Sequence, residues 1–304
     1  MAGNVTLDVP RTRFVVVHYH IFKNGGSTIE SILRREFGTG FTMLHGPGPN
    51  SILSGDDLGA FLRDYEVSAI SSHHLRYPLP ALPRTVIFDC CFLRHPLDRL
   101  VSVYTYYRGI DSPDPLCRRA CRQTARDFMS QTLQESPNMV SNVQVTQLAN
   151  AGAFTRPANE NDLECATQVF RNMAIPGLVD LFDESLVAAE YFVRPAFPGI
   201  RFDHTPHNVS REAGLARPAR FHKLEDDLVE LWGANLYADV TRLNEFDLKL
   251  YQSAQSEIRR RLFLIPGLDD KLVNFQARCA RLAARPAVTH AATGVTRPLQ
   301  VQTL

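Results

Sequence analysis

The stretch Phe14–Glu36 constrains the fold most, because it holds an apolar β-branched run, a polar turn and a helical pattern in that order. The run Phe14–Val17 is continuously bulky, which is typical of a strand buried on both faces. Gly25 and Gly26 supply backbone freedom directly before the helix expected over Ser27–Phe37. We therefore expect a strand, a turn and a helix whose N-terminus can hold an anion.

The position of Lys23 distinguishes this turn from the common nucleoside triphosphate loop. In G-x-x-x-x-G-K-[ST] the lysine follows the glycines, whereas Lys23 precedes them. A cation at the end of a buried strand has an electrostatic use, so we expect it to meet a 5′-phosphate rather than a wrapped triphosphate. Ser27 and Thr28 can each cap the helix, and Glu30 is spaced to complete a capping box with Ser27.

Length and composition place the chain in the ordinary globular class. It has 304 residues, of which 44% are hydrophobic, and a formal net charge of +1. We expect one domain over 1–284 and a flexible tail over 285–304. The balanced charge argues against nucleic acid as a partner and favours a small anionic ligand. We expect no membrane span and no signal peptide, and hence a cytoplasmic, bacterial or cytosolic setting.

The six cysteines show no paired C-x-x-C spacing, so reduced thiols are expected. Cys117 and Cys121 are close enough to form a disulfide, although a cytoplasmic setting disfavours one. No acidic cluster suggests a metal, and we expect none.

Alternating strand and helix patterns predict an α/β fold with a parallel sheet and right-handed crossovers. The glycine- and proline-rich segment 38–51 is expected to be a long loop on the substrate side. Strands are expected at Phe14–Val17, Val67–Ser71, Thr85–Leu93 and Gly177–Phe182. Beyond residue 98 the pattern is mainly helical, with helices expected at Arg99–Tyr107, Arg122–Leu133, Asn138–Ala149, Asp162–Met173, Glu184–Arg194, His222–Leu231, Val240–Phe263 and Asp269–Ala283.

A second motif, FLRHPLDRLVSVY, follows the strand Thr85–Leu93. Arg94 stands at the strand end, and Asp98 is placed to cap the helix that carries Ser102. Arg94 and Ser102 together can grip one phosphate, although Arg94 could equally pair with an acidic neighbour. Ligands of such sheets bind beyond the carboxyl ends of the strands, where Lys23, His73 and Arg94 all fall.

The two motifs HIFKNGGST and FLRHPLDRLVSVY together resemble those of the PAPS-dependent sulfotransferases, in particular the branch of heparan sulfate 2-O-sulfotransferases and their bacterial relatives. SSHHL is similar to that family's Gly-His segment, and the resemblance runs from about Phe14 to about Ala254. Phe22, Asn24 and Ser72 depart from the usual proline, threonine and glycine. The resemblance implies a P-loop-kinase-like parallel sheet with a mainly helical C-terminal half.

The resemblance also implies a donor, 3′-phosphoadenosine 5′-phosphosulfate (PAPS), and positions that bind it. Arg94 and Ser102 would hold the 3′-phosphate, and Arg211 in the late loop His204–Arg211 would close over the nucleotide. The residues that would hold the 5′-phosphosulfate are Lys23, Asn24, Gly25, Gly26, Ser27 and Thr28.

In-line sulfuryl transfer needs charge stabilisation at the leaving phosphate and a base at the acceptor. Lys23 suits the first need. His73 and His74 are the candidate bases, and His73 is favoured because it matches the family's Gly-His position. His20 is expected to be a hydrogen-bonded histidine that positions the loop.

Two other classes of function stay open at this point. A small-molecule kinase would need a lysine beside the loop hydroxyl and a magnesium-binding carboxylate, and neither is evident. A non-catalytic anion-binding module would not need Lys23, His73 and Arg94 together. The acceptor is expected to be a carbohydrate or glycoconjugate hydroxyl, with a phenol, alcohol or natural product as the alternative, and the oligomeric state is not readable.

Overall fold

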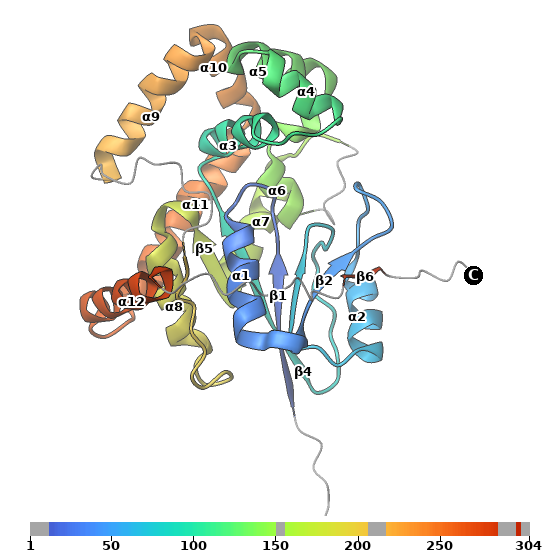
Figure 1. The fold of residues 1–304 in the computed structure, drawn as a ribbon, viewed down its shortest axis with the longest axis vertical. Helices are drawn as coiled ribbons and strands as arrows, with labels where there is room; N and C mark the ends of the chain where they lie inside the picture. The colour runs from blue at the N-terminus through green and yellow to red at the C-terminus, as the bar shows by residue number, and fades with distance from the viewer. Residues whose placement is uncertain (1–11, 150–155, 206–216, 285–295, 299–304) are drawn as a thin grey trace, which may run out of the picture.

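Five parallel strands form the centre of the structure, in the order β5-β4-β1-β3-β2, and a short β6 pairs beyond β2 (Figure 1). The computed structural model describes residues 12–149, 156–205, 217–284 and 296–298. The predicted parallel α/β sheet is thereby confirmed. The strands are β1 Arg13–Tyr19, β2 Phe41–His45, β3 Ala69–Ser72, β4 Thr85–Leu93, β5 Ile175–Leu178 and β6 Thr296–Pro298.

The central strand β1 is buried on both faces, as its sequence predicts. Val17 of β1 pairs with Ile70 of β3 on one side and with Asp89 of β4 on the other. Val15 and Val17 pack into the apolar core on one face of the sheet, and Val16 packs into the core on the other. The continuous apolar run of β1 therefore contributes side chains to the cores on both faces of the sheet.

Helices cover both faces of the sheet and build a further helical part above its edge (Figure 1). The core on one face is formed with α1 Gly26–Phe37, α8 Phe182–Val193 and α12 Leu268–Ala283. The core on the other face is formed with α2 Gly55–Asp64, α6 Val143–Leu148, α7 Glu160–Asn172 and α11 Glu245–Phe263. A third core, around Trp232, joins α3 Pro96–Arg108, α4 Pro115–Arg122, α5 Ala125–Glu135, α9 Arg217–Trp232 and α10 Ala234–Leu243.

The segment 38–51, which was expected to be a loop throughout, contains strand β2. Phe41 and Leu44 are buried against the sheet, and the glycines before them form a short 3-10 turn over Gly38–Gly40. The prediction was wrong because a five-residue strand is short enough to be hidden among the glycines and prolines around it.

The single helix expected over Val240–Phe263 is broken at Asn244, where α10 ends and α11 begins. The Asn244 side chain donates to the carbonyl oxygen of Val240 at 2.9 Å, and this local bond competes with helix continuation. An unpredicted helix, α4, also precedes α5, and the carboxylate of Asp114 caps it by accepting from the amide of Leu116.

The tail expected over 285–304 lies largely outside the described residues. Thr296–Pro298 is the part of it that is described, and it pairs in parallel with Met43–His45 of β2. All six cysteines are free thiols, so Cys117 and Cys121 do not form the disulfide that their spacing allowed.

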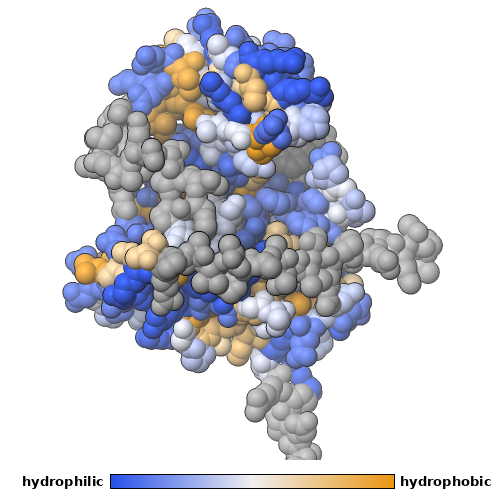
Figure 2. Space-filling view, viewed as in Figure 1, coloured by the Kyte–Doolittle hydropathy of each residue, from blue (hydrophilic) through white to orange (hydrophobic). Residues whose placement is uncertain are grey.

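Among the described residues, none of the helices combines the length and the apolar character needed to cross a membrane. On the face drawn in Figure 2, hydrophilic residues predominate among those described, and the apolar residues form scattered groups.

Candidate functional site

The turn after β1 exposes the N-terminus of α1. Lys23 and Gly25 adopt positive φ angles of 69° and 77°, and α1 begins at Gly26 with Gly25 as its N-cap. The predicted caps Ser27 and Thr28 are therefore wrong, since both lie inside the helix. Because glycine has no side chain to cap a helix, the first N–H groups of α1 remain available to an anion.

The second motif meets the first at the neighbouring strand end. Helix α3 begins at Pro96 after His95, so the predicted cap Asp98 lies in its first turn instead. Asp98 accepts a hydrogen bond from Nε of Arg94 at 2.5 Å, which is the acidic pairing that the sequence left open. Nη1 of Arg94 donates to the carbonyl oxygen of Lys23 at 3.3 Å. Arg94 thus links the two motifs.

Gln144, which the sequence reasoning missed, fastens the two loops together. Its Oε1 accepts from Nδ2 of Asn24 at 2.8 Å and from the amide of Arg94 at 3.0 Å, and its Nε2 donates to the Arg94 carbonyl at 2.9 Å. Gln144 and Asn24 are both buried. No sequence spacing could have revealed this link, because Gln144 lies on α6, far along the chain from both loops.

The two loops enclose a cavity of about 160 Å³ at the carboxyl ends of β1 and β4. Two larger cavities, of about 260 and 200 Å³, are lined by neither Lys23 nor Arg94, although His95 and Leu97 of the second motif line the smaller of these two. Asn24 is not among the lining residues, and its side chain also donates to the Phe92 carbonyl. The lining residues are His20, Phe22, Lys23, Gly25, Gly26, Ser27, Thr28, His73, Arg94, Ser102 and Tyr106. The predicted residue Arg211 lies outside the described residues.

Lys23 presents a positive charge that no acidic group offsets among the residues the structure describes. Its Nζ lies 4.4 Å from the centroid of the Tyr106 ring. Burial, and then the nearby positive charge of Arg94, lower the pKa of Lys23. Lys23 and Arg94, the latter paired with Asp98, leave a net positive charge in this half-buried cavity, which favours an anion there.

His73 lies on the cavity wall, whereas His74 does not. Nδ1 of His73 donates to the carbonyl oxygen of His20 at 2.9 Å, which leaves Nε2 as the proton acceptor of the neutral ring. Burial, together with His20, lowers the pKa of His73 to about 4. His74 instead accepts from the amide of Gly46 at 2.8 Å and packs edge-on against His45, so its ring supports the end of β2.

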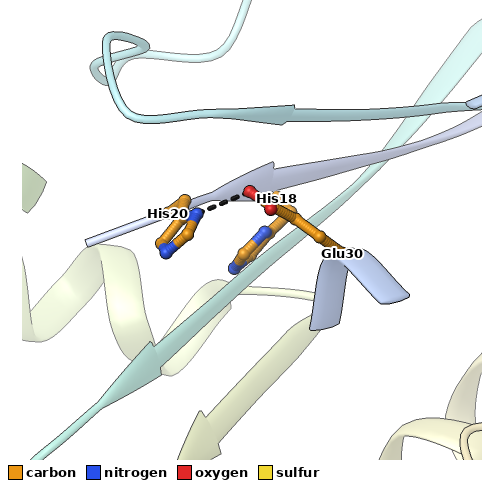
Figure 3. A group of neighbouring side chains, drawn as sticks. All are labelled: His18, His20 and Glu30. Atoms are coloured by element: carbon orange, nitrogen blue, oxygen red, sulfur yellow. Dashed lines mark hydrogen bonds and ion pairs between the residues drawn. The ribbon is translucent and has the colours of Figure 1, made fainter. Parts of the chain in front are cut away.

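Glu30 joins His18 of β1 and His20, which follows the strand, in a largely buried polar cluster that the sequence did not predict (Figure 3). Oε1 of Glu30 is 2.6 Å from Nδ1 of His20 and accepts from Oγ of Ser71 at 2.9 Å; the same Oγ is 2.9 Å from Nδ1 of His18. The capping box predicted for Glu30 is therefore wrong. His18 and His20 share one strand face by the period-two rule, and this was the available signal.

The same three side chains could bring metal-ligating atoms together. One such atom each from His18, His20 and Glu30 lies within 4.8 Å of the others. However, Nδ1 of His18, Nδ1 of His20 and Oε1 of Glu30 each already have a hydrogen-bond partner. We therefore describe the cluster as a hydrogen-bonded network.

Fold and site together define a class: an α/β protein with a cationic cavity between two loops at the carboxyl edge of a parallel sheet. No family model matches the chain. An uncharacterized protein of Archaeoglobus fulgidus is 26% identical over 249 residues, which cover 79% of this chain and 95% of that protein. The similarity spans most of both chains, and the relative's name carries no activity.

Proposed function

We propose that this protein is a sulfotransferase that moves a sulfuryl group from PAPS to an acceptor hydroxyl. The observation that carries the proposal is the meeting of two motifs in one cavity. Lys23 and the N-terminus of α1 come from the first motif, and Arg94 and Ser102 come from the second. Arg94 contacts the Lys23 carbonyl although the two residues are 71 positions apart in sequence.

The donor would bind with its two charged ends at the two motifs. Lys23, Gly25, Gly26, Ser27 and Thr28 would hold the 5′-phosphosulfate, and Arg94 with Ser102 would hold the 3′-phosphate. Asn24 would contribute through the shape of the loop, because its side chain is bonded to Gln144 and to the Phe92 carbonyl. The cavity is smaller than the roughly 300–1,000 Å³ of whole-ligand pockets, so the nucleoside would extend out of it.

We infer a P-loop-kinase-like sheet because the buried central strand β1 is followed by a glycine turn and a helix N-terminus at the carboxyl edge. The lysine before the glycines, rather than after them, favours the phosphosulfate donor over a nucleoside triphosphate.

The chemistry would be an in-line transfer with Lys23 and His73 on opposite sides of sulfur. The acceptor O–H proton passes to Nε2 of His73, the acceptor oxygen bonds to sulfur, and the bond from sulfur to the 5′-phosphate oxygen breaks. The Lys23 ammonium and the N–H groups of α1 stabilise the charge on the departing phosphate. We expect a carbohydrate or glycoconjugate hydroxyl as acceptor, with a phenol or alcohol as the alternative.

Binding of adenosine 3′,5′-bisphosphate, the product of the donor, is the first test. We expect it to raise the melting temperature, measured by scanning fluorimetry, whereas ATP with Mg²⁺ should not. Stabilisation by ATP alone would favour a kinase instead of a sulfotransferase. If neither nucleotide bound, both assignments would be overturned.

Transfer from sulfur-labelled PAPS to a panel of glycans, glycolipids and phenols is the second test. Lys23→Ala should lower the transfer rate by about 10²–10³-fold, because a charge stabiliser of the transition state is lost. Lys271→Ala is the matched control, since Lys271 lies on α12 and donates to the Pro266 carbonyl. An unchanged rate in Lys23→Ala would remove the lysine from the mechanism.

A further inference from the structure

His20 and His73 form a close, tilted pair of imidazoles on the wall of the cavity. Their ring centroids are 3.8 Å apart, and the rings are inclined by 32°. Nδ1 of His73 donates to the His20 carbonyl, so each ring is held by a bond that leaves its other nitrogen unprotonated when the ring is neutral. Two protonated rings at this separation would repel each other, so the pair is suited to carry a single positive charge.

The carboxylate of Glu30, on α1, lies next to the His20 ring of this pair. Its Oε1 is 2.6 Å from Nδ1 of His20, and the Glu30 side chain is 18% exposed. Burial opposes its ionisation, but the hydrogen bonds from His20 and Ser71 prevail and hold the pKa of Glu30 below its usual range. Glu30 therefore supplies a fixed negative charge beside the two rings at neutral pH.

Gly26 keeps the His20 ring in this position. A Cβ on Gly26 would lie 2.0 Å from Nε2 and from Cδ2 of His20, so the anion-binding turn rests on the imidazole. The phosphate-binding loop and the histidine pair are consequently one packed unit.

We propose that His20, His73 and Glu30 act as one proton-accepting unit, in which Glu30 is a positioning residue that offsets the charge of the imidazolium formed during transfer. The inference rests on the proposed function, because the acceptor hydroxyl supplies the proton. The acceptor O–H bond breaks and its proton binds Nε2 of His73, while the O–S bond forms and the bond from sulfur to the 5′-phosphate oxygen breaks. The Nδ1 proton of His20 stays on its bond to Glu30, and no further reactant is needed.

Other titratable or charged groups also surround the pair. His18 stacks on His20 with ring centroids 5.2 Å apart, and its own pKa lies well below the usual value because it is buried. Nη1 of Arg76 donates to the His73 carbonyl at 2.7 Å. His45, Lys23 and Arg94 are the other titratable or charged neighbours of the pair, and Glu30 is its acidic neighbour.

Titration of histidine-labelled protein by NMR tests the unit without relying on activity. Glu30→Gln keeps the shape of the side chain and removes its charge. We expect the protonation of His73 to move down by about one pH unit, because the Glu30 carboxylate raises the pKa of His73 in the wild type. The transfer rate should fall, while stabilisation by adenosine 3′,5′-bisphosphate is retained.

Glu36→Gln is the matched control, because Glu36 lies on the same helix and accepts from Arg35 and from the amide of Arg201. It should leave the histidine titration unchanged. An identical titration in wild type and Glu30→Gln would overturn the proposal, and so would a stoichiometric divalent metal that Glu30→Gln loses. A shifted titration without transfer from PAPS would keep the electrostatic coupling of Glu30 to the histidines and reject both the sulfotransferase assignment and the unit's role as proton acceptor in it.

Discussion

At the scale of single residues, Lys23 carries the clearest mark of function. A non-glycine residue at a φ of 69° costs about 1–2 kcal/mol, and here the residue is also a cation that burial and Arg94 disfavour. Nζ of Lys23 lies over the Tyr106 and Phe22 rings, 4.4 and 5.9 Å from their centroids, and such cation–π contacts are too weak to explain a strained lysine by themselves. Strain of this kind is common at active and ligand-binding sites, which agrees with the role proposed for Lys23.

Gly26 provides a prediction at the same scale. Gly26→Ala would place a methyl group 2.0 Å from the His20 ring, which cannot stay in position. We expect a loss of about 1–3 kcal/mol in the free energy of unfolding, measured by urea denaturation, and loss of nucleotide binding as the turn moves. Gly59→Ala in α2 is the control, because its Cβ would meet Pro80 at an ordinary 3.4 Å. Equal stability of the two variants would contradict the packing described here.

At the scale of elements, the short helix α6 holds the two loops of the site in position. The fully buried Asp247 of α11 accepts from the amides of Gln144 and Val145 at 3.0 and 2.8 Å and so caps α6. Helix α6 in turn presents the Gln144 side chain to the loops that follow β1 and β4. The loops at two strand ends are therefore positioned by two further helices, α6 and α11.

Gln144→Met tests this arrangement. The side chain is similar in size, but the amide of Arg94, its carbonyl and the Asn24 amide lose a buried partner. We expect a destabilisation of about 2–5 kcal/mol in urea denaturation and weaker binding of adenosine 3′,5′-bisphosphate by calorimetry. Gln131→Met is the control on α5, where the partners are Gln123 and Glu135. Unaltered binding in Gln144→Met would show that the loops hold their positions without it.

At the scale of the whole molecule, wholly or partly buried histidines make stability depend on pH. Burial is the largest cause that lowers the pKa of each of four of them, His18, His73, His74 and His95. A histidine whose pKa is lower in the folded state takes up its proton more readily when unfolded, so stability falls as the pH drops below about 6.5. Burial raises the pKa of Asp89 and Asp247, and these two carboxyls oppose that trend as they approach protonation.

Comparison of wild type with His73→Asn isolates one contribution. The pKa of His73 falls from 6.5 to about 4 on folding, so its share of stability is complete above pH 6.5 and is lost progressively down to about pH 4. We expect the wild type to lose about 3 kcal/mol relative to the variant across that window, by urea denaturation at several pH values. Parallel stability curves for the two proteins would contradict a buried neutral His73.

Much of the fold was accessible from sequence patterns. The strands β1 and β4, the helices α1, α7 and α12, and the parallel arrangement all follow from apolar periodicity and from alternation of strand and helix. Strand β2, the break at Asn244 and the helix starts at Gly26 and Pro96 were missed or misplaced. In each of these cases the local signal allowed two outcomes, and packing or a competing hydrogen bond selected one.

The order of strand, lysine, glycine pair and helix at Phe14–Glu36 was decided by the sequence alone, because hydrophobic periodicity and glycine conformational freedom are local properties. So was the expectation that Lys23, His73 and Arg94 share one sheet edge. Only the tertiary structure decided that Glu30 bonds His20 instead of capping its helix, and that Gln144 joins the two loops. The Gln144 contact links residues distant in the chain, and a carboxylate such as that of Glu30 offers the same hydrogen-bonding groups to many partners until packing selects one.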